Sequence, residues 1–142
     1  MTDPATLMLP HDSTAPGLAR AFVRSWLASR QLETLLDSAV LLTSEVVTNA
    51  VLHATGPIEL HLDHLGDGAR VAVADTSPIG PRRRRHSDRA TTGRGLQLID
   101  DVAGDWGWDA APNGKRVWFT LSAQDDPWAR FSDCDWLAGA EA

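Results

Sequence analysis

The chain has 142 residues, of which 43% are hydrophobic, so it has the size of one domain and enough apolar residues for a core. Its formal net charge of −6 argues against a protein that mainly coats a polyanion such as DNA. Cys134 is the single cysteine and cannot form an internal disulfide, so we expect a reducing compartment, the cytoplasm. No apolar run approaches the roughly 18–20 residues that span a bilayer, and no export signal is evident, so we expect no membrane association.

The charge is unevenly distributed along the chain. Residues 82–94 contain six arginines and one aspartate, whereas residues 124–142 contain five acidic residues and one arginine. We therefore expect a leader over residues 1–16, one domain over residues 17–123 and an acidic tail over residues 124–142. The tail also carries Trp128, Phe131 and Trp136. It is either a partner-docking segment or a disordered or self-packing extension.

Two helices are predicted in the first half of the chain. Residues 17–30 place apolar side chains at three- and four-residue spacing, which predicts an amphipathic helix. Residues 33–54 contain no glycine or proline and are followed by Thr55-Gly56-Pro57, which predicts one long helix that ends there. We expect Leu36, Val40, Val47, Val51 and Ala54 to form its core-facing stripe.

The strands are predicted as two hairpins. Residues 58–63 alternate strictly between apolar and polar, and a Gly66-Asp67-Gly68 turn connects them to the apolar run at 69–75. Residues 106–110 and 117–121 form the second hairpin, around Pro112-Asn113-Gly114. Between the hairpins lie a polar loop over 76–92, long enough to suggest a functional or disordered segment, and a short helix over 95–102.

The long predicted helix also carries a line of polar side chains. Glu45, Asn49 and His53 are spaced four residues apart and therefore share one side of the helix, between leucine and valine neighbours. One interpretation is an exposed polar face, or a local hydrogen bond between Glu45 and Asn49. The other is a pocket lining, because such groups are costly to bury unless they pair with each other or with a ligand. Asn49 could supply one oxygen to a hard cation such as Mg²⁺.

Two further features lie near the polar loop. Asp75 ends the apolar strand, where a carboxylate either reads a ligand or starts a turn. Gly93 and Gly95 precede the short predicted helix, a place where backbone N–H groups can approach a phosphate. The four arginines at 82–85 are open to three interpretations: a solvated patch, a nucleic-acid patch or a lid that faces phosphate.

Taken in order, these motifs resemble the GHKL ATPase superfamily, in the form found in bacterial anti-sigma-factor serine kinases. The run from Glu45 through Asn49 to His53 is similar to that superfamily's N-box. Asp75-Thr-Ser-Pro stands at the position of its adenine-reading Asp-x-Gly box, and Thr92-Gly93-Arg94-Gly95-Leu96 is similar to its second glycine box. Ser77 departs from the Asp-box glycine, and Lys115 stands after Gly114 where many members have threonine.

The resemblance implies an α+β two-layer sandwich, the Bergerat ATP-binding fold, with a mixed, mainly antiparallel sheet and helices on one face. It implies ATP and Mg²⁺ as cofactors and roles for individual residues. Glu45 would act as general base on the attacking hydroxyl or would polarise the ligand shell of the metal. Asn49 would bind Mg²⁺, His53 would support the site, and Asp75 would accept a hydrogen bond from the adenine amino group. The remaining nucleotide-binding residues would be Ser77, Thr92, Gly93, Arg94, Gly95 and Leu96.

The resemblance further implies a serine/threonine kinase that phosphorylates an anti-anti-sigma (STAS) protein and regulates a sigma factor. Phosphoryl transfer suits this set of residues, since it needs positioning and charge neutralisation more than a protein nucleophile. The two departures from the motifs favour a second hypothesis, a nucleotide-gated binding module without turnover. A homodimer is expected only because of the resemblance to this family. A nucleic-acid binder is the third hypothesis, and the negative net charge opposes it.

Overall fold

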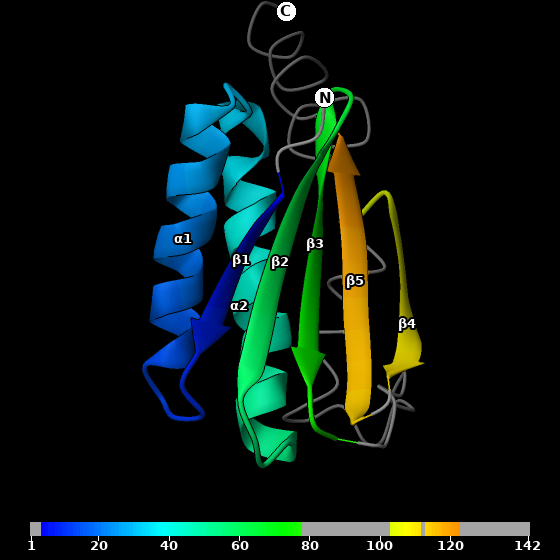
Figure 1. Ribbon diagram of the computed structural model, residues 1–142. Coiled ribbons are helices and arrows are strands. Elements are labelled where there is room, and N and C mark those ends of the chain that lie inside the picture. The colour runs from blue at the N-terminus through cyan, green and yellow to red at the C-terminus, as the bar shows by residue number, and fades with distance from the viewer. Residues whose placement is uncertain (1–3, 78–102, 112, 123–142) are drawn as a thin grey trace, which may run out of the picture.

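The computed structural model describes residues 4–77, 103–111 and 113–122. They form two layers, a five-stranded sheet with two helices packed on one of its faces (Figure 1). The strand order is β1-β2-β3-β5-β4, and every pairing among the described strands is antiparallel. The predicted α+β sandwich is therefore confirmed.

The elements follow the predicted order closely. Both hairpins and both helices are present within one or two residues of most predicted ends. The bounds are β1 Ala5–Leu9, α1 Ala15–Ser29, a 3₁₀ turn η1 Glu33–Leu35, α2 Leu36–His53, β2 Ile58–Leu65, β3 Gly68–Asp75, β4 Asp105–Ala111 and β5 Gly114–Ser122. Most of the predicted polar loop, the short helix at 95–102 and the acidic tail lie outside the described residues.

Strand β1 is an element that the sequence pattern does not predict. It lies within the segment that we expected to be a leader, and it pairs with β2 from Ala5 opposite Leu62 to Leu9 opposite Ile58. Leu9 is 2% exposed and belongs to the core. Residues 1–16 therefore contribute both an edge strand and the first residues of α1 to the sandwich.

Helix α1 has clear signals at both ends. The Asp12 carboxylate accepts hydrogen bonds from the Thr14 hydroxyl and from its backbone N–H, which lower the pKa of Asp12, and Pro16 lies in the first turn. At the other end Gln31 adopts φ of +58°, and the Leu32 N–H returns to the Leu27 carbonyl at 2.9 Å. This is the left-handed ending that glycine usually provides.

Helix α2 buries a different face from the one predicted. Its fully buried residues centre roughly a quarter of a turn away from the expected stripe, at 100° per residue. Val47 and Ala54 are buried as expected, whereas Leu36, Val40 and Val51 are only partly buried. The reason is that α2 packs against both the sheet and α1, so one broad arc of the helix is covered and its centre moves away from the predicted stripe. The buried helix residues are Ser38, Ala39, Leu42, Thr43, Val46, Val47 and Ala50.

The segment Glu33–His53 is long and apolar enough, with a mean hydropathy of 1.4, to cross a membrane by length and composition alone. The sequence analysis did not anticipate this, because polar residues interrupt the apolar run. In the structure the segment lies in the domain core, where it packs beside α1 and against the sheet (Figure 1).

The register of the central strands decides which side chains face the helices. Val71 lies opposite Phe119, Val73 opposite Val117 and Asp75 opposite Lys115. Alternate residues of a strand point to the same face, so both members of each pair face the core. The first two pairs form a column of apolar side chains under the helices. The column ends in one charged pair, Asp75 and Lys115.

Candidate functional site

The charged pair at the end of the column is buried. The Asp75 side chain is 3% exposed and the Lys115 side chain 8% exposed. Lys115 Nζ donates hydrogen bonds to both carboxylate oxygens of Asp75, at 2.9 Å to Oδ1 and 2.7 Å to Oδ2. An ion pair removed from water is costly to form, and losing one partner leaves an uncompensated charge. This pair therefore holds the ends of β3 and β5 in one specific arrangement.

Two neighbours fix the position of the pair. The Ser77 backbone N–H donates to Asp75 Oδ1 at 2.8 Å, so the chain turns immediately after β3. Gly114 pairs with β3 so closely that a Cβ there would lie 1.9 Å from the Asp75 carbonyl oxygen. Only glycine permits this approach, which brings the first residues of β5 against the Asp75 backbone.

A side-chain hydroxyl connects this end of the sheet to helix α2. Thr76 Oγ1 accepts hydrogen bonds from the backbone N–H of Gly56 at 2.9 Å and of Thr55 at 3.3 Å. These two residues come just after Ala54, the residue that caps the C-terminal end of α2. Figure 1 accordingly shows the end of α2 and the end of β3 at the same end of the molecule.

The polar side chains of α2 lie along the border of its buried face. Glu45 and Asn49 are half-buried, and His53, the last residue of the helix, is exposed. Within the described part of the chain neither Glu45 nor Asn49 has a hydrogen-bond partner. The local hydrogen bond that we considered between them is therefore absent from the structure. Because both side chains are half-exposed and bonded to no other described residue, their polar atoms are accessible to water or to a ligand.

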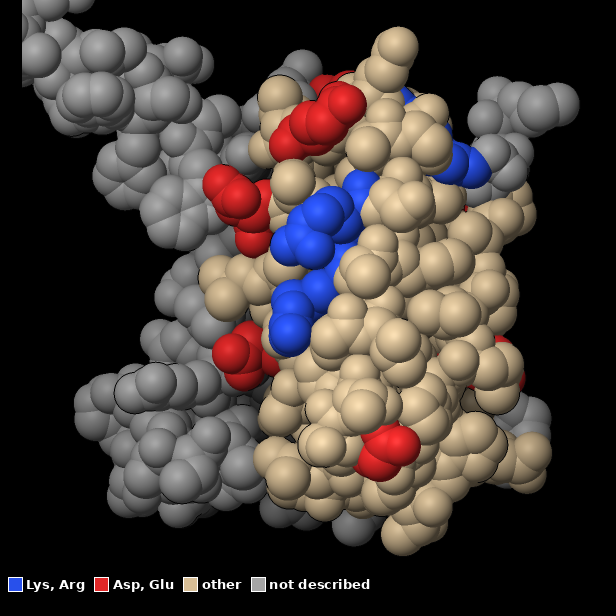
Figure 2. Space-filling view, turned by 90° about the vertical axis from the view of Figure 1, so that its left-hand side faces the viewer, with Lys and Arg blue, Asp and Glu red and all other residues tan. Residues whose placement is uncertain are grey.

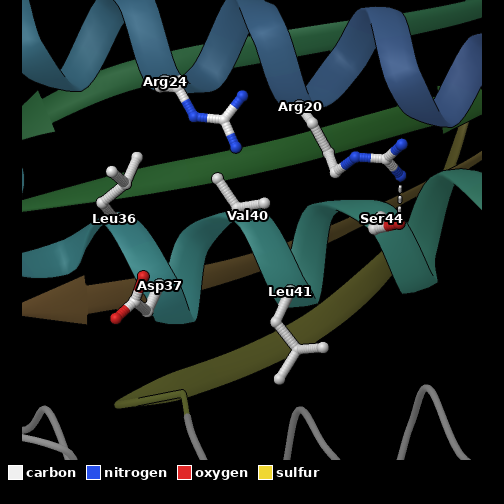
Figure 3. A pocket seen from close by; sticks show the side chains of 7 residues that line it. All are labelled: Arg20, Arg24, Leu36, Asp37, Val40, Leu41 and Ser44. Atoms are coloured by element: carbon white, nitrogen blue, oxygen red, sulfur yellow. Dashed lines mark hydrogen bonds between the residues drawn. The ribbon is translucent and has the colours of Figure 1, made fainter.

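A second polar feature is the groove between α1 and α2, with a volume of about 300 Å³. Figure 2 views the molecule from the α1 side and shows basic side chains gathered on this face. From α1, Arg24 extends toward Leu36 and Val40 of α2, and Arg20 extends toward Ser44, where its Nη1 donates to Ser44 Oγ at 2.9 Å (Figure 3). This groove lies on the solvent side of the helices, whereas the charged pair lies beneath them.

The structure thus places four of the predicted site residues at one end of the sandwich: Asn49, His53, Asp75 and Ser77. Glu45 lies one helical turn before Asn49, about 6 Å along the axis. The other predicted residues, Thr92, Gly93, Arg94, Gly95 and Leu96, lie outside the described residues, as do the four arginines at 82–85. Within the described ranges no cluster of three or more His, Cys, Asp or Glu side chains could hold a metal ion.

A family model, that of the histidine kinase-like ATPase domain, matches residues 9–121, which is most of the chain. The chain belongs to the histidine kinase-like ATPase family. A comparison with curated proteins gave no match. Membership of this family supports ATP binding and a kinase-like, ATP-dependent activity for the domain.

Sequence reasoning missed two contacts of this ATPase domain. It identified Lys115 as a departure from a family pattern, but not as the partner of Asp75. It placed Thr76 in the loop and in the Asp75-Thr-Ser-Pro motif, but assigned no contact to its side chain. The signal for the first contact was a lysine after a hairpin glycine and an aspartate at the end of an apolar strand. Only the pairing of β3 with β5, residues 40 apart in sequence, brings them together.

Proposed function

We propose that this domain is an ATP-dependent serine/threonine kinase that phosphorylates an anti-anti-sigma (STAS) protein and thereby regulates a sigma factor. The observation that carries the proposal is the pair of half-buried, unpartnered side chains of Glu45 and Asn49 on consecutive turns of α2, above the end of the sheet that carries Asp75. A base and an amide ligand at this spacing suit transfer of a phosphoryl group to a hydroxyl.

The residues of α2 fit a bound Mg²⁺ in number and type. Mg²⁺ in nucleotide sites takes one or two protein oxygens and completes its shell with phosphate oxygens and water. Asn49 offers one such oxygen, since its side chain has no other partner among the described residues. The ion would neutralise charge on the ATP phosphates. Glu45 would accept the proton of the attacking hydroxyl, and Asp75 would contact the base.

Phosphoryl transfer tests the proposal directly. The purified protein is incubated with γ-labelled ATP, Mg²⁺ and a panel of STAS-domain proteins from the same genome. We expect labelled serine or threonine on one of them. Glu45→Gln should retain ATP binding and lose transfer, because it removes the base but keeps the size of the side chain. Asp37→Asn, an exposed carboxylate on the same helix, is the matched control and should transfer normally. ATP binding without transfer to any member of the panel would refute the kinase.

A specific observation favours a second candidate, a nucleotide-gated protein that binds partners without turnover. The carboxylate expected to read adenine already pairs with Lys115 through both oxygens. In such a module Asn49→Ala should abolish nucleotide-dependent partner binding, whereas Glu45→Ala should leave it unchanged. In the kinase, both substitutions should abolish phosphorylation. Pull-down of the sigma factor with and without ATP, alongside the labelling assay, separates the two candidates.

A further inference from the structure

The Asp75–Lys115 pair leaves one donor and one acceptor unused. A lysine ammonium has three donors, and the two hydrogen bonds to Asp75 use two of them. Lys115 has no other partner within the described residues. Oδ1 accepts from Ser77 and Lys115, while Oδ2 accepts from Lys115 alone. Each carboxylate oxygen can accept two hydrogen bonds, so Oδ2 still has room for one.

This combination differs chemically from a lone carboxylate. A lone carboxylate only accepts hydrogen bonds, so it suits the 6-amino group of adenine and repels the 6-oxo group of guanine. An ammonium beside it adds a donor. Guanine presents an acceptor at O6 next to a donor at N1, and adenine presents a donor at N6 next to an acceptor at N1. The pair can therefore satisfy two adjacent positions on either purine.

We propose that Asp75 and Lys115 together read the nucleotide base and that Lys115 makes the site accept guanine as well as adenine. This inference rests on the proposed function, in which the base of a bound nucleoside triphosphate meets Asp75. Lys115 is then the residue that determines purine specificity.

The surroundings of the pair support a reading role. Both side chains are more than 90% buried, so a mismatched base would leave a desolvated group without a partner. The pair is also held in place, by the Ser77 N–H on one side and by the close approach of Gly114 on the other. Rigid, dehydrated hydrogen-bonding groups discriminate between ligands more strongly than mobile, solvated ones.

Binding to the wild-type protein provides the first test. Isothermal titration in the presence of Mg²⁺ compares ATP, GTP, inosine triphosphate and purine riboside triphosphate, which has no substituent at position 6. We expect the first three nucleotides to bind within about tenfold of one another and purine riboside triphosphate to bind about tenfold more weakly, because it lacks the 6-substituent and therefore one of the two contacts. A preference for ATP over GTP and inosine triphosphate beyond that range would overturn the inference. Equal binding of all four would also overturn it, because the base would not be read.

The proposed function fails in a distinguishable way, since in that case none of the four triphosphates binds. Variants provide the second test. Lys115→Thr should raise the preference for ATP over GTP by about tenfold or more, because it removes the donor to O6. Lys115→Arg keeps a cationic donor and should keep the wild-type ratio. Arg116→Thr, the next residue of β5 and on the other face of the sheet, is the matched control.

An unchanged GTP-to-ATP ratio in folded Lys115→Thr would overturn the assignment of Lys115. Circular dichroism establishes whether the variant is folded. If it is not, the wild-type nucleotide series decides the inference alone.

Discussion

The two charged regions of the domain, the Asp75–Lys115 pair and the arginines of the α1–α2 groove, differ in what surrounds them. Arg24 is exposed and Arg20 half-buried, so water can solvate much of their charge. Asp75 and Lys115 lie under the helices, where each is the charged partner of the other and the Ser77 backbone N–H donates a further hydrogen bond to Asp75. An exposed ion pair contributes little to the free energy of unfolding. A buried charge is strongly destabilising once its partner is removed, so it favours the one conformation in which the partner is in place. A charge that the fold keeps in its interior at such cost is the better candidate for function.

Removing the Lys115 ammonium tests the buried region most severely. Lys115→Met keeps a similar volume but leaves the Asp75 carboxylate buried with one backbone partner. We expect a loss of about 3–5 kcal/mol in the free energy of unfolding. Urea denaturation measures it. The double variant Asp75→Asn/Lys115→Met should recover most of the loss, and failure to recover any of it would mean that packing, not charge, dominates at this position.

The backbone contact behind the pair gives the next largest effect. Gly114→Ala places a methyl group 1.9 Å from the Asp75 carbonyl oxygen, so the two strands must separate. We expect a loss of about 1–3 kcal/mol, together with weaker nucleotide binding. Gly17→Ala is the control, because its Cβ would lie 3.5 Å from Arg20 and meets only a flexible side chain. Thermal denaturation of both variants checks the prediction, and equal losses would contradict it.

Thr43 offers the reverse case, a buried polar group without a partner. Its side chain on α2 is fully buried and its hydroxyl has no hydrogen bond. Thr43→Val keeps the shape and removes the unsatisfied group, so we expect a gain of about 1 kcal/mol in the free energy of unfolding. Thr43→Ala, which removes the methyl group as well, should not show this gain. A destabilised Thr43→Val would indicate that the hydroxyl is satisfied in solution.

The exposed region should respond least. Arg24→Ala should change the free energy of unfolding by no more than about 0.5 kcal/mol, since its guanidinium is solvated. Arg20→Ala loses the hydrogen bond to Ser44 and should cost about 1 kcal/mol. Urea denaturation at low and high salt measures both. An effect of Arg24→Ala as large as that of Lys115→Met would remove the distinction between the two regions.

Local patterns were enough to predict most of the fold. The alternation at 58–63 and the glycine turns predicted both hairpins, because these contacts join neighbours in sequence. The pairing of β1 with β2 joins residues that are 49 to 57 apart in sequence, and no local pattern in this proline-containing segment predicts it. The buried face of α2 was misplaced for a related reason: helical periodicity shows where apolar residues gather, but not how many neighbours cover them.

The candidate site was predictable in its residue types and not in its contacts. Spacing alone placed Glu45 and Asn49 on one side of α2. The partner of Asp75 could not be predicted, because it depends on the β3–β5 register, which brings residues 75 and 115 opposite each other. The lysine at position 115 was interpreted only as a departure from the family's threonine, whereas the structure shows it as the side-chain partner of the Asp75 carboxylate.

Because Thr76 Oγ1 accepts from the amides of Thr55 and Gly56, hydrogen exchange at these two amides can report on the contact between α2 and β3. The amide protons of Thr55 and Gly56 are bound to a side chain, not to the backbone ladder that protects β2 and β3. They should therefore exchange whenever the end of α2 separates from the end of β3, even while the sheet stays intact. Their exchange rates, with and without nucleotide, report how tightly the helix carrying Asn49 stays attached to the strand carrying Asp75.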